Sequence, residues 1–84
     1  MMRYTVVWNQ LALSELGEVW LAAKDRDAVS YACHVIDQEL ALNASLRGEA
    51  LHEGLRVLWV APLKVIFFVQ EEDRTVEITT VRGE

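Results

Sequence analysis

The chain has 84 residues, a formal net charge of −5, and 52% hydrophobic and 25% charged residues. This length suits one domain spanning residues 1–84, because a chain of this size buries just over ~60% of its unfolded surface. The negative charge argues against sequence-independent nucleic-acid binding. No apolar run approaches the ~18 residues of a membrane span. Since no signal-peptide pattern follows Met1 either, we expect a soluble, cytoplasmic protein.

The first half of the chain predicts one strand followed by two helices. Residues 3–8 are rich in β-branched and aromatic side chains and end at Asn9, a residue type that caps helices well. From Gln10 to Ala23 the apolar residues recur at three- and four-residue steps and form one core-facing stripe. The members of this stripe are Ala12, Leu13, Leu16, Val19, Trp20 and Ala23.

A second helix follows closely. Asp25 and Asp27 are candidate caps, and helical spacing of apolar residues then continues from Ala28 to about Leu42. Two helices joined by so short a link predict an antiparallel hairpin. Residues 43–53 have mixed polarity and predict a loop, with Leu46 and Leu51 as its anchors on the core.

The last third of the chain predicts a meander of three strands. After Gly54 the apolar residues alternate or run continuously, with turns at Ala61-Pro62 and at residues 71–74. The predicted order is β-α-α-β-β-β. We therefore expect an α+β fold in which the helical hairpin packs on one face of a mainly antiparallel, curved sheet.

The turns predict which strand residues share a face. Two-residue loops at Pro62-Leu63 and Glu72-Asp73 would pair Ala61 with Lys64 and Glu71 with Arg74. Because strand side chains alternate, the predicted helix-facing set is Arg56, Leu58, Val60, Val65, Phe67, Val69, Val76, Ile78 and Thr80.

The opposite face carries an apolar cluster at its centre. Its members are Val57, Trp59, Ile66 and Phe68, while Lys64 and Val81 lie on the same predicted face. If this cluster is exposed, it marks a partner-binding surface. In the alternative interpretation the sheet curls and the side chains cover one another. If the loop between the first two strands of the meander had an odd number of residues, the side chains of the second strand would exchange faces.

Cysteine and histidine give no sign of a metal or cofactor site. The single cysteine, Cys33, excludes an intramolecular disulfide, and metal-type Cys/His spacing is absent. His34 lies in the middle of the second predicted helix, and His52 lies in the predicted loop beside Glu53. We interpret both as ordinary surface or half-buried histidines rather than proton-transfer groups.

Several short pieces of the sequence, in this order and spacing, resemble the RelE/ParE superfamily of type II toxin-antitoxin toxins. They are Tyr4-Thr5-Val6-Val7-Trp8, Ala12 with Glu15-Leu16 and Trp20, Asp25-Arg26 before Ala28-Val29, Gly54-Leu55-Arg56-Val57-Leu58, Pro62-Leu63-Lys64-Val65 and Val76-Glu77-Ile78. The resemblance implies a toxin neutralised by a cognate antitoxin. It also implies one of two activities, ribosome-dependent mRNA cleavage as in RelE or poisoning of DNA gyrase as in ParE.

In the RelE branch, the resemblance implies catalytic cations at Lys64 and Arg82, with Arg56 as a third candidate. Such an endoribonuclease needs several cations converging on the open sheet face. The predicted register places Arg56 on the helix face instead, and the Tyr or His that follows the last strand in active nucleases has no counterpart before Glu84.

All three cations also have structural interpretations. Lys64 and Arg82 can be solvated strand cations that discourage aggregation, and the Arg56 stem can cover apolar surface while its head pairs with a carboxylate such as that of Glu53.

These departures favour a ParE-like toxin that is not hydrolytic and acts on a protein target. A RelE-like mRNA endoribonuclease is the first alternative. The second alternative is a catalytically inert module of the same fold that forms a homodimer through Trp59, Ile66 and Phe68. For the antitoxin we expect a helix in a groove beside the helical hairpin or an extended segment across the sheet, with basic residues that complement the acidic toxin.

Overall fold

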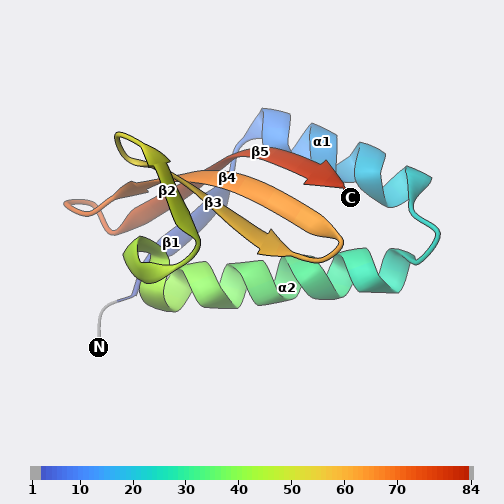
Figure 1. Ribbon diagram of the computed structural model, residues 1–84, viewed down its shortest axis with the longest axis horizontal. Coiled ribbons are helices and arrows are strands. Elements are labelled where there is room, and N and C mark those ends of the chain that lie inside the picture. Colours follow the sequence, from blue (N-terminus) through green and yellow to red (C-terminus); the bar gives the residue numbers. More distant parts are fainter. Residues whose placement is uncertain (1–2, 84) are drawn as a thin grey trace.

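The structure is a computed structural model and describes residues 3–83. Its elements are β1 (Thr5–Trp8), α1 (Gln10–Ala22), α2 (Arg26–Asn43), the short 3-10 helix η1 (Ala44–Leu46), β2 (Glu49–His52), β3 (Leu55–Val60), β4 (Leu63–Gln70) and β5 (Thr75–Gly83). The α+β fold and the order of the predicted elements are confirmed (Figure 1). One strand, β2, was not predicted.

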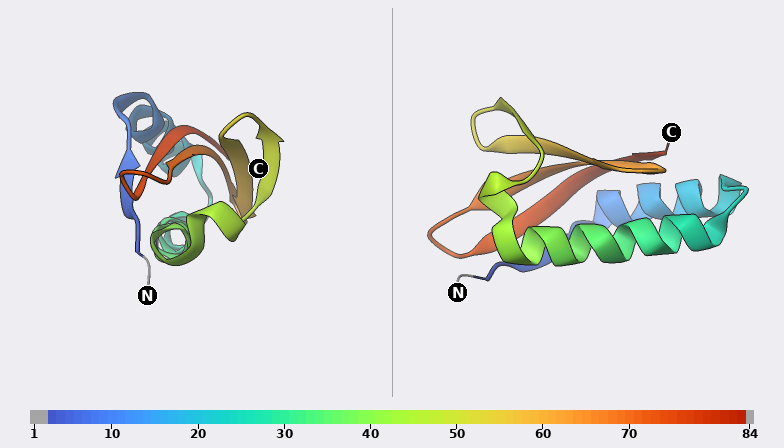
Figure 2. Two further views of the ribbon diagram at one scale, coloured as in Figure 1. Left: turned by 90° about the vertical axis from the view of Figure 1, so that its left-hand side faces the viewer. Right: turned by 60° about the horizontal axis from the view of Figure 1, so that its bottom comes forward.

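The five strands form one mixed sheet in the order β1-β5-β4-β3-β2. β1 runs parallel to β5, and the other neighbours are antiparallel. The sheet curves around α2, which lies on its concave side (Figure 2). α1 continues the direction of β1 and packs mainly along β5.

Capping side chains set where the helices begin. The Asn9 side chain accepts a hydrogen bond from the backbone N–H of Ala12 at 2.8 Å, and Asp25 accepts one from Ala28 at 3.1 Å. Arg26 closes the end of α1, because its guanidinium donates to the carbonyls of Trp20 and Leu21, both at 3.0 Å. The contacts of Asp25 and Arg26 define the short link between the helices.

The core is built mainly by α2 and the concave face of the sheet. The buried residues of α2 are Val29, Ala32, Ile36 and Leu40, and the strands contribute Leu63, Val65, Phe67, Val76, Ile78 and Val81. α1 contributes less than its sequence predicts. Leu13 and Trp20 are 53% and 40% exposed, because only the side of α1 that carries Ala12, Leu16, Val19 and Ala23 packs against the core.

The predicted loop at residues 43–53 is wrong, because this segment contains η1 and β2. Its supposed anchors do not reach the core, since Leu46 is 77% and Leu51 is 49% exposed. β2 is short, and its pairing with β3 shifts register between Ala50 and His52. A strand this short and irregular has little hydrophobic alternation of its own. It forms because the backbone of β3 is available for hydrogen bonding.

The turn between β3 and β4 lies one residue earlier than predicted. Val60 pairs with Leu63 and Trp59 with Lys64, so the register is shifted by two positions. A shift of two preserves the alternation of side chains. The predicted faces of β3 and β4 are therefore correct although the predicted pairs are wrong.

A β-bulge in β5 overturns the prediction at the end of the sheet. Phe67 pairs with Ile78, but its neighbour Ile66 pairs with Thr80, which leaves Thr79 as an extra residue. One extra residue moves all later side chains to the other face. Val81, predicted on the outer face, is 1% exposed in the core, and Thr80, predicted in the core, lies on the outer face.

Two glycine substitutions test the position of the linker before β2. Gly48 has φ +69°, and a Cβ there would overlap the carbonyl oxygen of Val57. We expect Gly48→Ala to lower the free energy of unfolding by about 2 kcal/mol or more, because the left-handed conformation alone costs an alanine ~1–2 kcal/mol.

Gly17→Ala is the matched control. Nothing lies within 4 Å of a Cβ at Gly17, so alanine should raise the free energy of unfolding by about 0.5–1 kcal/mol through helix propensity. Urea denaturation of both variants measures the two effects. Wild-type stability of the Gly48→Ala variant would contradict the packing of this linker on β3.

Candidate functional site

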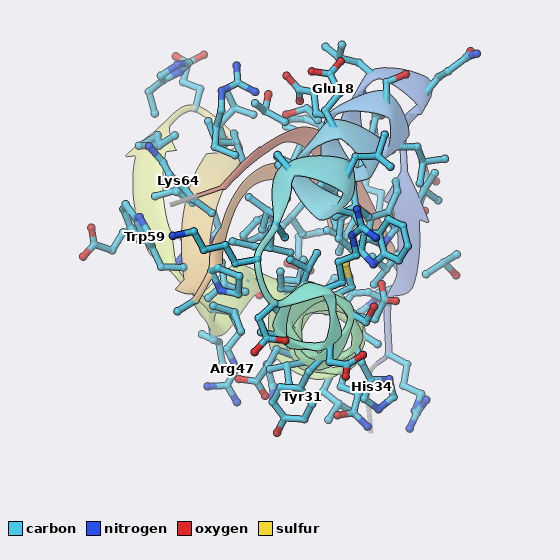
Figure 3. The ribbon with its side chains drawn as sticks, turned by 90° about the vertical axis from the view of Figure 1, so that its right-hand side faces the viewer. Glu18, Tyr31, His34, Arg47, Trp59 and Lys64 are labelled. Carbon is cyan, nitrogen blue, oxygen red and sulfur yellow. The ribbon has the colours of Figure 1, made fainter. Side chains whose placement is uncertain are left out.

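Three of the predicted residues form a row across the outer face of the sheet. Trp59 of β3 lies directly opposite Lys64 of β4, and Lys64 lies directly opposite Arg82 of β5. The Nζ atom of Lys64 is 5.5 Å from the centre of the Trp59 ring, a cation–π distance. Figure 3 shows Trp59 and Lys64 together on the strands, away from Tyr31 and His34 of α2. The structure thus brings Lys64 and Arg82 together.

The bulge in β5 is what places Arg82 in this row. Without the extra residue, Lys64 would face Val81, and Arg82 would point to the helix side of the sheet. Bulges commonly re-aim a side chain in this way. The hydroxyl of Thr79 donates to the carbonyl of Ile66 at 3.2 Å and so holds the bulge in place.

Arg82 is paired with a carboxylate that the sequence did not single out as functional. Its guanidinium forms an ion pair with Glu15 of α1. The other carboxylate oxygen of Glu15 accepts a hydrogen bond from the backbone N–H of Val81 at 3.0 Å. β1 pairs with β5 only as far as Ile78. Beyond that residue, the Glu15 carboxylate supplies a hydrogen-bond acceptor for the backbone of β5.

These contacts hold Glu15 in its charged form. The hydrogen bond from Val81, and after it the one from Arg82, lowers the pKa of the Glu15 carboxyl below its ordinary value of 4.5. The Glu15 side chain is 20% exposed, whereas that of Arg82 is 60% exposed. Two features of the sequence pointed to Glu15: it lies at the border of the core-facing stripe of α1, and Glu15-Leu16 is part of the resemblance to the toxin superfamily.

Arg56 has a different place and a different set of partners. It lies on the helix-facing side of β3, as predicted, and therefore opposite to the face of Lys64 and Arg82. Its guanidinium donates to the carbonyls of Arg47 at 2.8 Å and Gly48 at 3.1 Å. The predicted carboxylate partner is wrong, because Arg56 ties β3 to the linker between η1 and β2 instead.

The apolar cluster on the outer face is more covered than predicted. Val57 is 1% exposed, because the unpredicted strand β2 places Glu49 on one side of it and β4 places Ile66 on the other. Ile66 and Phe68 are half-buried, and the Phe68 ring packs against Gly54. Trp59 is 48% exposed and is the main apolar side chain that this cluster offers to a partner.

An apolar groove opens at the same end of the molecule. It lies between the end of α1, the start of α2 and the turn joining β3 to β4, and its volume is about 840 Å³. Small apolar side chains dominate its walls, and Glu18, Lys24 and Asp25 lie at it. A groove is thus present beside the helical hairpin.

The remaining polar candidates lie apart from this end of the sheet. His34 on α2 and His52 on β2 are both exposed. His52 was predicted in a loop but lies on a strand. Burial, and then the charge of Asp37, raises the pKa of the half-buried Cys33 thiol. Within residues 3–83, no three metal-ligating side chains gather, and neither helix has both the length and the apolar character needed to cross a membrane.

Comparison with known proteins identifies the fold. No protein-family model matches the sequence, and no curated protein matches it. Among solved structures, the toxin-antitoxin complex RelBE2 from Mycobacterium tuberculosis contains a chain that is 17% identical with a TM-score of 0.82, and the match covers 100% of this chain and 94% of that one.

Two further structures show how widely this fold is used. The chromosomal ParDE system of Pseudomonas aeruginosa matches with a TM-score of 0.66 at 14% identity, over 96% of both chains. TrmO from the same species matches with a TM-score of 0.63 at 18% identity, over 99% of this chain but only 37% of that one. At these identities the comparisons establish the fold, which is that of the RelE/ParE superfamily toxins.

Removal of the Arg56 guanidinium tests its structural role. Arg56→Met keeps the apolar stem but leaves two backbone carbonyls without their donors, so we expect the free energy of unfolding to fall by about 1–3 kcal/mol. Hydrogen exchange at the β2 amides should also accelerate more than at β4. Unchanged stability and unchanged exchange would show that the linker does not depend on Arg56.

The Glu15 contacts predict a dependence of stability on pH. A carboxyl whose pKa is lower in the folded than in the unfolded state stabilises the fold above its unfolded pKa, and this contribution disappears as pH falls through the folded pKa. Glu15→Gln should therefore be less stable than wild type above pH 4.5, and the difference should shrink on acidification. Urea denaturation across this range measures it. A difference that is constant with pH would contradict the ion pair.

Proposed function

We propose that this chain, which has the fold of RelE and ParE toxins, is the toxin component of a type II toxin-antitoxin system and is neutralised by a cognate antitoxin. Two observations support the proposal. The structures that match over nearly their whole length come from toxin-antitoxin complexes. The groove beside the helical hairpin, whose walls are mostly small apolar side chains, suits an antitoxin segment that carries apolar residues.

The pairing of Arg82 favours a toxin that does not cleave RNA. An endoribonuclease of this fold must stabilise a developing phosphorane-like charge with several available cations. Here Arg82 is paired with Glu15, Lys64 lies over Trp59, and Arg56 binds carbonyls on the other face of the sheet. Together with the net charge of −5, this supports a ParE-like toxin whose target is a protein such as DNA gyrase.

The exposed part of the outer face is the surface that we assign to the target. Trp59 is 48% exposed at the end of β3, with the half-buried Ile66 and Phe68 on neighbouring β4. Tryptophan is among the residues that most often dominate binding energy at protein interfaces. Val57, which is buried, acts beneath this surface by packing rather than by contact with the target.

One observation favours a second candidate function. Lys64 and Arg82 lie directly opposite each other on the outer face, and Trp59 lies beside them, so two cations and an aromatic ring adjoin. In a RelE-like endoribonuclease such a group would bind mRNA, with the ribosome completing the site. The likeness of this chain to part of TrmO also shows that the fold alone does not specify a function.

Induced expression of the chain tests the proposal. We expect growth arrest with intact mRNA, and we expect the Lys64→Ala, Arg82→Ala double variant to arrest growth as wild type does. Trp59→Ala should weaken target binding by about tenfold or more, as expected for an interface hot spot. Leu46→Ala is the control, since Leu46 is 77% exposed on η1 and lies outside this surface. Growth curves, mRNA integrity and a gyrase supercoiling assay provide the readouts.

Two outcomes would overturn the proposal. Arrest with cleaved mRNA, abolished in the double variant, would establish the endoribonuclease. Normal growth, with a homodimer of the purified chain in solution, would establish the inert interaction module.

A further inference from the structure

Two like charges face each other at the end of the sheet. Lys64 and Arg82 are directly opposite on neighbouring antiparallel strands and on the same face. Like charges in this arrangement destabilise a sheet. Each cation has a partner on its outer side, Trp59 for Lys64 and Glu15 for Arg82. The side chains therefore form a row of aromatic ring, cation, cation and anion across three strands and one helix.

Two cations on directly opposite strand residues can hold a phosphate group between them, because arginine and lysine both donate charge-assisted hydrogen bonds to its oxygens. Arg82 is open to such a ligand, since its side chain is 60% exposed. The carboxylate of Glu15 opposes that use of Arg82. It accepts a hydrogen bond from Nη1 of Arg82, which also donates to the Val81 carbonyl at 3.0 Å. Its negative charge repels any anion that approaches the pair.

Glu15 is held so that it stays beside Arg82. One of its oxygens accepts the backbone N–H of Val81 at 3.0 Å, and its side chain is only 20% exposed. A flexible surface glutamate would lose contact with Arg82 much of the time. Glu15 is instead fixed by the strand that carries Arg82, so an incoming phosphate meets the carboxylate as well as the cations.

We propose that Glu15 is a built-in counter-ion that keeps the Lys64–Arg82 pair from binding phosphate, and that removal of this one negative charge turns the pair into a phosphate-binding site. Glu15 then determines the specificity of this surface, because it excludes phosphate-bearing ligands and leaves the outer face to proteins. The inference goes beyond the proposed function and concerns the isolated chain, without antitoxin or target.

The substitution Glu15→Gln separates the charge from the structural contact. The amide oxygen of glutamine can still accept the hydrogen bond from Val81, and the side chain has almost the same volume. Glu18→Gln is the matched control, because Glu18 lies one turn further along α1, is exposed, and changes the net charge by the same amount. Glu15→Met, which removes both the charge and the hydrogen bond, provides a second variant should the amide disturb the fold.

Titration with inorganic phosphate at constant ionic strength tests the proposal, with binding followed through the backbone amide NMR signals of Lys64 and Arg82. We expect Glu15→Gln to bind phosphate about five- to tenfold more tightly than wild type, the range expected when one close charge in a partly exposed site is removed. Glu15→Met should do the same, and Glu18→Gln should bind as wild type does. Adding Arg82→Ala to the Glu15→Gln variant should abolish the gain.

Three outcomes would overturn the proposal. Equal affinities for wild type and both Glu15 variants would show that Glu15 does not oppose phosphate. An equal gain in Glu18→Gln would show that only net charge matters. A gain that survives Arg82→Ala would place phosphate elsewhere. Because the probe is phosphate alone, none of these results depends on whether the chain is a toxin.

Discussion

One extra residue in β5 determines how the end of this sheet is built. Thr79 is left unpaired between Ile78, which faces Phe67, and Thr80, which faces Ile66. Ile78 and Val81 can therefore both be buried, although strict alternation would place them on opposite faces. Arg82 reaches the outer face beside Lys64 for the same reason. Core packing and the composition of the candidate site thus depend on a single irregularity, which the Thr79 hydroxyl holds through the Ile66 carbonyl.

The second dependence is between α1 and the edge of β5. β1 pairs with β5 only as far as Ile78, and the exposed edge beyond it would attract other strands. α1 runs along this edge, and Glu15 accepts the hydrogen bond of the Val81 amide. The same carboxylate neutralises Arg82. A contact that completes the sheet therefore also sets the electrostatic character of the outer face, so stability and ligand preference are coupled in one side chain.

The arginines show why the number of cations in a sequence is a poor guide to a nucleic-acid site. Arg26 closes the end of α1 and stacks on Trp20 at 4.6 Å from the ring centre, while Arg56 holds the linker to β2. Each satisfies backbone carbonyls that would otherwise lack a donor. In an acidic chain of 84 residues, cations used in this way are not available to bind phosphate, which agrees with the proposal of a protein target.

The sequence by itself determined the local features of this protein. Asn9 and Asp25 cap helices through their own side chains, and the apolar spacing of α2, β3 and β4 assigns their buried faces, because these signals depend on residues close together in the chain. Tertiary structure alone decided the rest. β2 forms against β3 and buries Val57, and the bulge and the β1–β5 pairing bring Glu15 to Arg82 across 67 positions of sequence. Such contacts join segments that are far apart in the sequence. The pattern of one segment does not predict which other segment it contacts, so these contacts are determined only when the fold packs.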